Sequence, residues 1–550
     1  MSTGFTRRWR LLQYLLAPSL AAVTTIGSVQ AEDQFSTAGL ETVVVQTSAF
    51  EDTDAEEPAP EPVAETPAPA PEPMAQPVVE YQELGPVTSC NCAPTTCCTK
   101  KDKEAAAAAA KKAYAGVYYG NNFSYLKDPC YDGPVFCSDK LKNIDMPLGT
   151  LSLGGETRYR YHSERNHRGV GITGRDDQFW LSRHRLYADW KLCDAVRVYG
   201  EVLDANSQGE TFGPRPIEEN DMDIQNLFVD VKLFDGDCGT LTTRIGRQEL
   251  LLGAQRTVSP LDWANTRRTF EGVRGMYKSG DFTLDAFWTQ FVPVDPKEAD
   301  EANEDIQFYG LYAVEKNFVF DQIEAYYLGF DNTTAADFSV HTIGTRVSGA
   351  SDSGILYDFE GAFQFGDDRT IDDHSAGFFT AGLGRKIETD CFSPTIWLYY
   401  DYASGEEDFS DVSRSDGGYD HLFPLAHKYN GFMDLFGRRN LHDLNVFSAT
   451  PLSKKVTMIV WYHYFALAED TTPYSVVMTP YNTNSAAGDR SLGHEIDLAF
   501  NINLNPRNNI FLGYSHFSAG DYYDTTAGLP TGVDDDADAD FFYAQFTTRY

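Results

Sequence analysis

The chain has 550 residues, of which 13% are aromatic, and it carries 81 acidic against 44 basic residues. This excess of negative charge argues against nucleic acid as a partner, because phosphate backbones are bound by basic surfaces. A negative mean hydropathy combined with many aromatic residues argues against a bundle of membrane-spanning helices. It favours one large structure of short alternating strands.

The first 31 residues predict a cleaved export signal. Three arginines (Arg7, Arg8, Arg10) precede an apolar stretch over 11–26, and small residues at 29–31 offer a cleavage site. A membrane anchor is the alternative, but the apolar stretch is short, contains a proline and lacks a stop-transfer pattern. The mature chain is therefore expected to begin directly after residue 31.

Two segments separate this signal from the long C-terminal region. Residues 32–89 form an acidic, proline-rich tract that prefers extended polyproline II and cannot bury a core, so we predict a disordered spacer. Residues 90–147 hold six of the nine cysteines, and the alanine-rich stretch at 100–112 predicts a short helix. We predict a small cysteine-containing periplasmic module over 90–147.

From residue 148 to 550, apolar and polar side chains alternate with a period of two. In the first segment Tyr159 and Tyr161 share one parity and Arg158 and Arg160 the other, so one face suits lipid and the other water. We predict about eighteen such strands. They cover roughly 150–163, 178–191, 195–204, 223–233, 240–248, 270–278, 281–290, 306–315, 321–330, 339–348, 355–365, 375–386, 393–402, 440–449, 455–466, 492–502, 508–516 and 540–550.

The connections between these strands alternate between long and short. Odd-numbered connections include 205–222, 403–439 and 467–491, whereas even-numbered ones include 192–194 and 279–280. This asymmetry is typical of an outer-membrane barrel, which has long extracellular loops, short periplasmic turns and an even strand count. The predicted fold is therefore all-β, a transmembrane antiparallel β-barrel of about 18 strands.

The three cysteines of this region, Cys193, Cys238 and Cys391, all fall in even-numbered turns. All nine cysteines would then lie in the oxidising periplasm, which predicts disulfides within the N-terminal module or between it and the barrel rim. A zinc site built from Cys90, Cys92, Cys97 and Cys98 is the alternative, but their spacing is irregular. We predict neither a metal nor any other cofactor.

Several motifs occur in order along the strand region. They are Leu153-Gly154-Gly155-Glu156-x-Arg158-x-Arg160-Tyr161, Arg183-x-Arg185-Leu186, Arg244-x-Gly246-Arg247-Gln248-Glu249-Leu250, Asp262-Trp263 with Arg268-x-Phe270-x-Gly272-Val273-Arg274, Asp401-Tyr402-Ala403-Ser404-Gly405, His427-Lys428-Tyr429-x-Gly431-Phe432-Met433-Asp434, Asn440-Leu441-His442-Asp443-Leu444 and Gly493-His494-Glu495-x-Asp497. With these motifs, residues 148–550 resemble the alginate export porins of bacterial outer membranes. The resemblance implies an eighteen-stranded barrel whose electropositive constriction passes an anionic polysaccharide outward. Residues 32–147 match nothing in that family.

Strand parity places eight arginines toward the lumen as candidate pore-lining residues that bind the substrate. They are Arg158, Arg160, Arg183, Arg185, Arg197, Arg244, Arg274 and Arg346. Guanidinium groups stay charged and offer forked donors to carboxylates, so a polyanion could pass from one arginine to the next. The alternative is that inward carboxylates pair with these arginines and brace the barrel. These carboxylates are Glu156, Asp189, Glu201, Asp230, Asp285, Asp358, Glu360, Glu495 and Asp497.

Two long connections, 249–269 and 403–439, are the best candidates to fold inward and narrow the pore. The acidic run at 534–540 lacks the spacing of a calcium loop, so we read it as a solvated charge cluster.

No hydrolase, zinc-protease or phosphate-binding motif is found, so we predict a channel in the outer membrane and no enzyme. Its predicted partners are outer-membrane lipid and anionic polysaccharide or small anions, with the cell wall or periplasmic export proteins as further candidates. The alternatives are a general porin or an envelope-structural barrel anchored to the wall by its N-terminal region; an outer-membrane hydrolase is less favoured.

The last strand carries an alternating aromatic ending. Phe542, Phe546 and Tyr550 share the lipid-facing parity, whereas Tyr543 and Arg549 face the lumen. This ending resembles the C-terminal signal by which outer-membrane barrels are recognised. Tyr550 is therefore expected at the periplasmic end of the closing strand.

Overall fold

The structure is a computed structural model of the chain. It describes residues 98–169, 171–334, 337–368, 371–411, 417–529, 533 and 537–550. The predicted signal, the predicted spacer, three cysteines (Cys90, Cys92, Cys97) and part of the acidic run (Asp534, Asp535, Asp536) lie outside the described residues.

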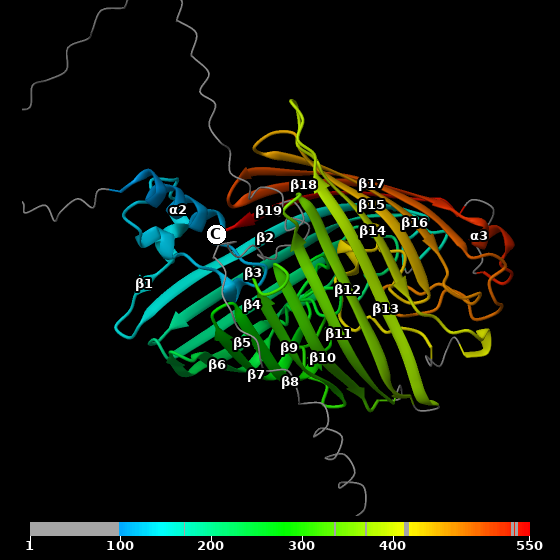
Figure 1. Cartoon of the computed structure of the whole chain (residues 1–550), viewed down its shortest axis with the longest axis horizontal. Coiled ribbons are helices and arrows are strands. Elements are labelled where there is room, and N and C mark those ends of the chain that lie inside the picture. The colour runs from blue at the N-terminus through cyan, green and yellow to red at the C-terminus, as the bar shows by residue number, and fades with distance from the viewer. Residues whose placement is uncertain are drawn as a thin grey trace, which may run out of the picture. The chain divides into compact units, whose positions relative to one another are not determined.

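The described residues form one closed antiparallel barrel (Figure 1). Its strands are β2 (Thr150–Arg165), β3 (Asp177–Lys191), β4 (Val196–Gln208), β5 (Asn220–Gly236), β6 (Gly239–Gln248), β7 (Thr269–Ser279), β8 (Phe282–Val292), β9 (Ile306–Lys316), β10 (Gln322–Asn332), β11 (Phe338–Ala350), β12 (Ile355–Asp368), β13 (Ile371–Lys386), β14 (Thr395–Ala403), β15 (Leu441–Pro451), β16 (Val456–Ala466), β17 (Ser491–Asn505), β18 (Asn508–Ala519) and β19 (Ala539–Arg549). Each pairs with its neighbour in chain order, and β19 pairs with β2 to close the sheet. The predicted eighteen-stranded architecture is confirmed.

The seam between β19 and β2 confirms the expected parity of the side chains on the closing strand. Phe542 and Phe546 are exposed on the outer face, whereas Tyr543 is fully buried inside. Tyr550 extends the ladder, because its backbone exchanges hydrogen bonds of 2.8 and 3.0 Å with Gly155 of β2. The barrel thus has no free edge at this seam.

Alternation along each strand sorts the side chains between the two faces of the wall. Large apolar residues such as Trp180, Leu311 and Leu444 are about half exposed on the outside, as a lipid-facing surface requires. Charged residues of the opposite parity, such as Arg185 and Glu201, are buried inside. Among the described residues, no helix is both long and apolar enough to span a membrane.

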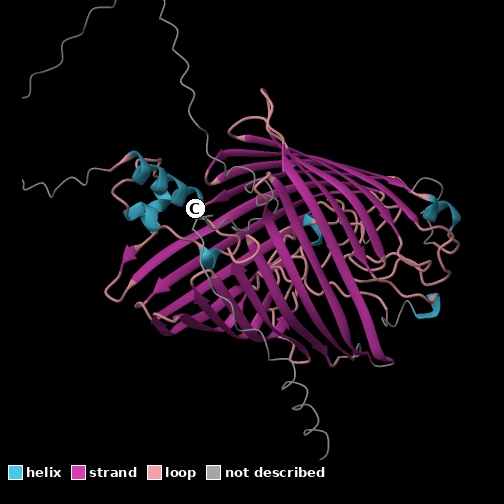
Figure 2. Ribbon diagram, viewed as in Figure 1, coloured by secondary structure: helices cyan, strands magenta, loops and turns pink. Residues whose placement is uncertain are grey.

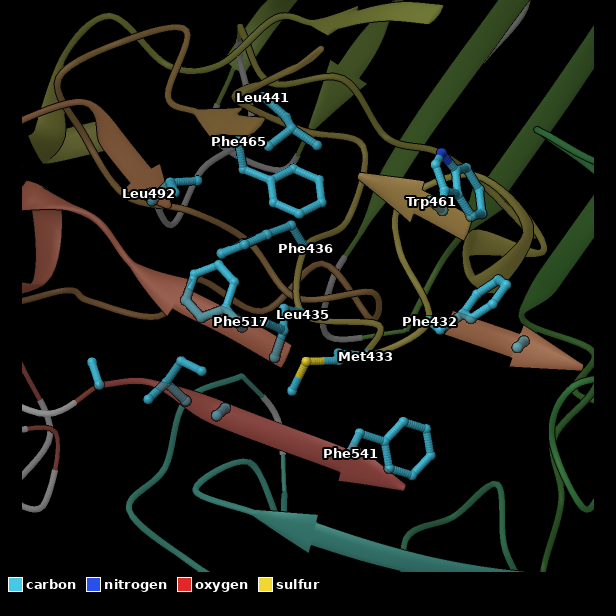
Figure 3. Close-up of a cluster of buried hydrophobic side chains, with 14 of the residues drawn as sticks. Phe432, Met433, Leu435, Phe436, Leu441, Trp461, Phe465, Leu492, Phe517 and Phe541 are labelled. Carbon is cyan, nitrogen blue, oxygen red and sulfur yellow. The ribbon is translucent and has the colours of Figure 1, made fainter. Parts of the chain in front are cut away.

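The long connections fold into the lumen and are packed there. Phe432 and Phe436, from the connection between β14 and β15, meet inward aromatic residues of the wall such as Trp461 and Phe517 (Figure 3). A second apolar cluster joins Leu252 and Val258 of the connection before β7 to neighbouring strands. The predicted inward folding of connections 249–269 and 403–439 is confirmed; the connection 467–490 also buries residues, which the sequence did not indicate.

A small helical module precedes the barrel (Figure 2). It contains α2 (Lys100–Lys111), three 3-10 turns, η1 (Tyr118–Gly120), η2 (Ser124–Lys127) and η3 (Cys137–Leu141), and the short strand β1 (Ile144–Asp145), which pairs with β2. Thr99 and Asp102 cap the start of α2 reciprocally. The remaining short elements lie in the long connections: η4 (Phe409–Asp411), η5 (Ala426–Lys428) and α3 (Asp521–Thr525).

The predicted disulfides are found in part. Cys98 and Cys130 form a disulfide within the module, as predicted. Among the described residues, Cys137 and the three turn cysteines, Cys193, Cys238 and Cys391, are free and exposed.

Candidate pore constriction

All eight arginines predicted to face the lumen lie on the inner wall, seven of them buried and Arg197 partly buried. Six pair with inward carboxylates from neighbouring strands. The pairs are Arg183 with Glu156 (2.7 Å), Arg185 with Glu201 (2.5 Å), Arg197 with Asp189 (2.6 Å), Arg244 with Asp230 (2.7 Å), Arg274 with Asp285 (2.7 Å) and Arg346 with Asp358 (2.7 Å). For these six, the charge is balanced within the wall.

Arg158 and Arg160 differ from the other six, because neither forms an ion pair within the described part of the chain. Arg158 donates hydrogen bonds to the backbone oxygens of Asp262 (2.8 Å) and Ala264 (2.5 Å). Arg160 donates to Gln545 and to the backbone oxygen of Trp263, both at 2.8 Å. Backbone and amide oxygens accept these hydrogen bonds, the Arg158 Nε is buried without a partner among the described residues, and neither guanidinium group has a carboxylate ion-pair partner there.

A cavity opens beside these two guanidinium groups. Its lining contains five basic residues against two acidic ones: Arg158, Arg160, Arg183, Lys428 and Arg549 against Glu156 and Asp262. The chain as a whole has a formal charge of −37, so this local excess of positive charge is opposite to the molecule's own sign. Such a cavity attracts anions.

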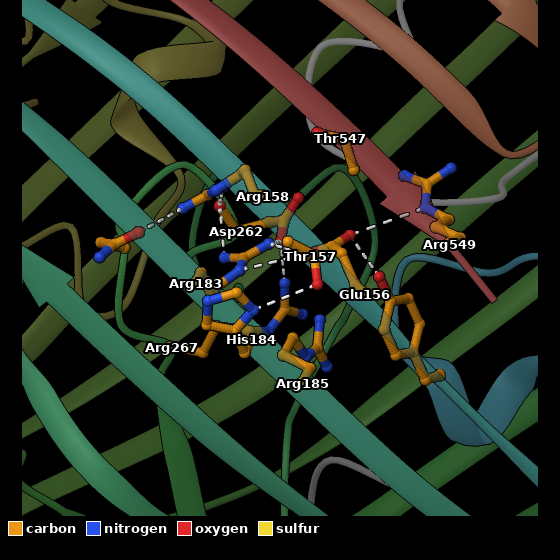
Figure 4. Close-up of polar contacts among 12 residues, drawn as sticks. Glu156, Thr157, Arg158, Arg183, His184, Arg185, Asp262, Arg267, Thr547 and Arg549 are labelled. Atoms are coloured by element: carbon orange, nitrogen blue, oxygen red, sulfur yellow. Dashed lines mark hydrogen bonds and ion pairs between the residues drawn. The ribbon is translucent and has the colours of Figure 1, made fainter.

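The connection between β6 and β7 forms one wall of the cavity. Its Asp262 accepts hydrogen bonds from Arg183 (2.9 Å) and Arg267, and Figure 4 shows these side chains pointing toward one another. Burial alone would raise the pKa of Asp262, but Arg267 and Arg183 hold it well below its usual range. Asp262 is therefore a fixed negative charge that positions two arginines.

Trp263 of the same connection lies between the side chains of Arg160 and His427. The Arg160 guanidinium is 3.8 Å from the centre of its ring, and the His427 ring stacks on it at 3.5 Å. His427 also contacts Asp434 at 2.9 Å. The indole thus holds Arg160 in place at the cavity wall.

Sequence parity could not identify the cavity residues that come from connections. Lys428 and His427 belong to η5, and they reach the cavity only because the connection before β15 folds inward. Both occur in one of the motifs that carried the family resemblance, which is the only signal that singled them out.

Elsewhere on the inner wall, one histidine and three carboxylic acids are fully buried together: His463, Asp443, Glu495 and Asp497. None of them forms an ion pair with an arginine among the described residues. His463 contacts Asp443 at 3.0 Å and lies 3.9 Å from Asp497, and Glu495 accepts a hydrogen bond from the backbone of Met433. The alternative that inward carboxylates pair with the lumen arginines therefore does not hold for Glu495 and Asp497. The strand register places His463 opposite Glu495 and Ser515 opposite Asp497, so neither position has an arginine as its cross-strand neighbour.

No group of three or more potential metal ligands occurs among the described residues. From the acidic run, Asp540 pairs with Arg165 and His516, each at 2.9 Å.

The chain matches a known protein family in sequence and known barrels in structure. A family model described as alginate export matches residues 150–530, more than two thirds of the chain. This match agrees with the resemblance carried by the motifs and begins at the first barrel strand. No curated protein matches the chain significantly.

Among solved structures, the chain is similar to Pseudomonas aeruginosa OccK8 (OprE), with 13% identity and a TM-score of 0.50, over 73% of this chain and 98% of that one. Acinetobacter baumannii OccAB1 has 13% identity and a TM-score of 0.48, over 73% and 96% of the two chains. The outer membrane protein OprD from Pseudomonas aeruginosa has 11% identity and a TM-score of 0.47, over 76% and 97%. The likeness to OccK8 shows a shared barrel fold.

Proposed function

The chain belongs to the alginate export family of outer-membrane channels, and on that premise we propose that it passes anionic solutes and exports an acidic polysaccharide such as alginate. The single observation that carries this proposal is the cavity with five basic and two acidic lining residues inside an acidic chain. The barrel is embedded in outer-membrane lipid through its apolar outer face. The family and the fold are those of a channel, and we propose no catalytic role.

Arg158 and Arg160 are the residues we propose to touch the passing anion first. Neither forms an ion pair with a carboxylate among the described residues, and both line the cavity. A carboxylate in the cavity would gain charge-assisted hydrogen bonds in place of neutral backbone and amide acceptors. Arg183 and Lys428 offer the next contacts, so a chain of uronate groups would move by exchange between neighbouring cations.

Orientation follows from the connections of the barrel. We propose that the short turns, together with the N-terminal module, lie in the periplasm and that the long connections lie at the outer surface. This arrangement places the module where a polysaccharide made inside the cell would enter the barrel. The alternating lengths of the connections support it.

The test is selectivity in planar bilayers. We expect reversal potentials that favour anions, and block by acidic oligosaccharides but not by neutral ones of equal length. The double variant Arg158→Gln, Arg160→Gln should lower the anion preference by about tenfold, because both uncompensated charges are lost. The matched control, Lys100→Gln with Lys101→Gln on the exposed face of α2, should leave it unchanged.

Two results would overturn this proposal. Cation preference in the unmodified chain would remove the anionic substrate class altogether. Equal block by small carboxylates and by long acidic oligosaccharides would instead favour a general porin for small anions.

A further inference from the structure

The segment 113–126 of the N-terminal module, called here the inserted segment, lies against the inner wall of the barrel. Tyr118 is 3% exposed and its ring centre is 5.8 Å from that of Tyr187 on β3. Tyr119 packs edge-on against Tyr199 of β4 and Phe228 of β5, at 5.8 and 5.3 Å. These wall residues have the inward parity and are buried, so the two tyrosines occupy the lumen.

Polar contacts fix the same segment to the wall and to an inward-folded connection. The Tyr118 hydroxyl donates to Glu156, and the Tyr119 hydroxyl donates to the backbone oxygen of Glu249 at 2.6 Å. In the opposite direction, Arg197 donates to the backbone oxygen of Tyr119 at 2.6 Å. Arg267 likewise donates to the backbone oxygen of Gly116 at 3.1 Å.

The two tyrosine rings also cover arginines. Arg185 lies 4.0 Å from the centre of the Tyr118 ring, and Arg244 lies 4.1 Å from that of Tyr119. With Arg197 bonded to the Tyr119 backbone, three of the eight lumen arginines are in contact with the inserted segment. We call Arg185, Arg197 and Arg244 the covered arginines, and Arg158, Arg160 and Arg183 the cavity arginines.

The rest of the module is anchored at the end of the barrel that carries the short turns. Asp139 pairs with Arg507 in the turn between β17 and β18. Lys142 donates to the backbone oxygens of Leu153 (2.6 Å) and Tyr550 (3.1 Å). The inserted segment thus enters the lumen from the short-turn end, while its flanks hold the rim.

We propose that the inserted segment is an autoinhibitory plug, which closes the short-turn mouth and must withdraw before a solute passes. Among the contacts that hold it within the lumen are hydrogen bonds from Arg197 and Arg267 to neutral backbone oxygens and two cation–π contacts, which a carboxylate can replace with stronger charge-assisted bonds. An acidic polysaccharide entering from that side would compete for the covered arginines and displace the two tyrosines. The displacement by an anion rests on the proposed function; the closure itself does not.

Conductance of the full chain in potassium chloride tests closure without any sugar. The double variant Tyr118→Ala, Tyr119→Ala should raise the mean conductance by about threefold or more, because the rings no longer fill the mouth. The control is Val135→Ala, at a module residue that lies outside the inserted segment and is 68% exposed. It should conduct like the unmodified chain, and correct folding is checked by the slower gel mobility of the barrel after heating. Equal conductance of the unmodified chain and the folded double variant would overturn the plug.

Amide hydrogen exchange on the unmodified chain supplies a second measurement that needs no variant. Amides of the inserted segment should be protected in the free chain, and their exchange should quicken by about tenfold when alginate oligomers are added. Rapid exchange in the free chain would overturn the plug. Protection that persists with bound oligomers would overturn displacement by the anion. If both assays support the plug but the chain prefers cations, closure by the inserted segment stands. Only the proposed anionic substrate is then refuted.

Discussion

The cavity arginines and the covered arginines come from the same strand pattern, yet their surroundings differ. Two of the three cavity arginines, Arg158 and Arg160, bond to backbone and amide oxygens, whereas all three covered arginines pair with carboxylates and contact the inserted segment. Inward parity therefore tells where an arginine points and not whether its charge is available. Availability depends on which neighbours the strand register and the inward-folded connections bring to it.

Truncating one arginine from each group should give the largest contrast. Arg185→Met leaves the fully buried Glu201 without its cation, which should lower the free energy of unfolding by about 3–5 kcal/mol. Arg160→Met removes two hydrogen bonds and a ring contact without stranding a carboxylate, so about 1–3 kcal/mol is expected. Urea unfolding in detergent, followed by tryptophan fluorescence, measures both. Equal losses would mean that the two groups are not energetically distinct.

Substitution of Asp262 would remove one of the carboxylate partners of the cavity arginine Arg183. Asp262→Asn should free Arg183 and Arg267 from a shared carboxylate, raise the anion preference and destabilise the connection before β7 by about 2–3 kcal/mol. Reversal potentials and urea unfolding report the two effects separately.

The pH dependence follows from the same carboxyl group. Because the pKa of Asp262 is held well below the ordinary 3.8, its stabilising contribution is present above that value and is lost only as pH falls toward the lower folded-state pKa. The contribution of Asp262 to anion preference should therefore stay constant between pH 7 and about 4. A change in preference centred near pH 4 would show that Asp262 titrates normally and does not fix the arginines.

Trp263 should matter only to the cavity group. Trp263→Leu removes the stacking that holds Arg160 and should weaken block by acidic oligosaccharides by about five- to tenfold, which corresponds to roughly 1–1.4 kcal/mol of cation–π energy. Conductance in salt alone should be unaffected, since the inserted segment does not contact this indole through any described ring pair. Dose–response curves for block measure the change, and an unaltered curve would contradict the role assigned to the indole.

The smallest expected effect separates the ring of Tyr118 from its hydroxyl. Tyr118→Phe keeps the ring over Arg185 and loses only the bond to Glu156, so it should weaken docking of the inserted segment by about 1 kcal/mol. Amide exchange of residues 113–126 should quicken by a few fold, with conductance still close to that of the unmodified chain. Full opening by this variant would show that the hydroxyl, and not the ring, keeps the mouth closed.

Much of the wall could be predicted from the sequence, because parity and connection length are local properties. The strand bounds, the lumenal position of Arg158 and Arg185 and the outward position of Phe542 all follow from a period of two. Their partners do not follow, because Glu201 reaches Arg185 through cross-strand register and Asp262 reaches Arg183 through a folded connection.

The insertion of segment 113–126 into the lumen could not be predicted from the sequence either. Tyr118 and Tyr119 stand in an irregular stretch, with neither helical nor strand periodicity, so no pattern marks them as residues that bind a distant wall. Lys428 was found only through a family motif, and its arrival at the cavity depends on long-range packing of the connection before β15.

The site of Lys142 has a consequence for the order of assembly. Its ammonium group bonds to Leu153 on the first barrel strand and to Tyr550 beside the last, residues that become neighbours only when β19 meets β2. The part of the docking site that Lys142 occupies therefore does not exist in a half-built barrel. Complete docking of Lys142 therefore requires that the last strand already lies beside the first.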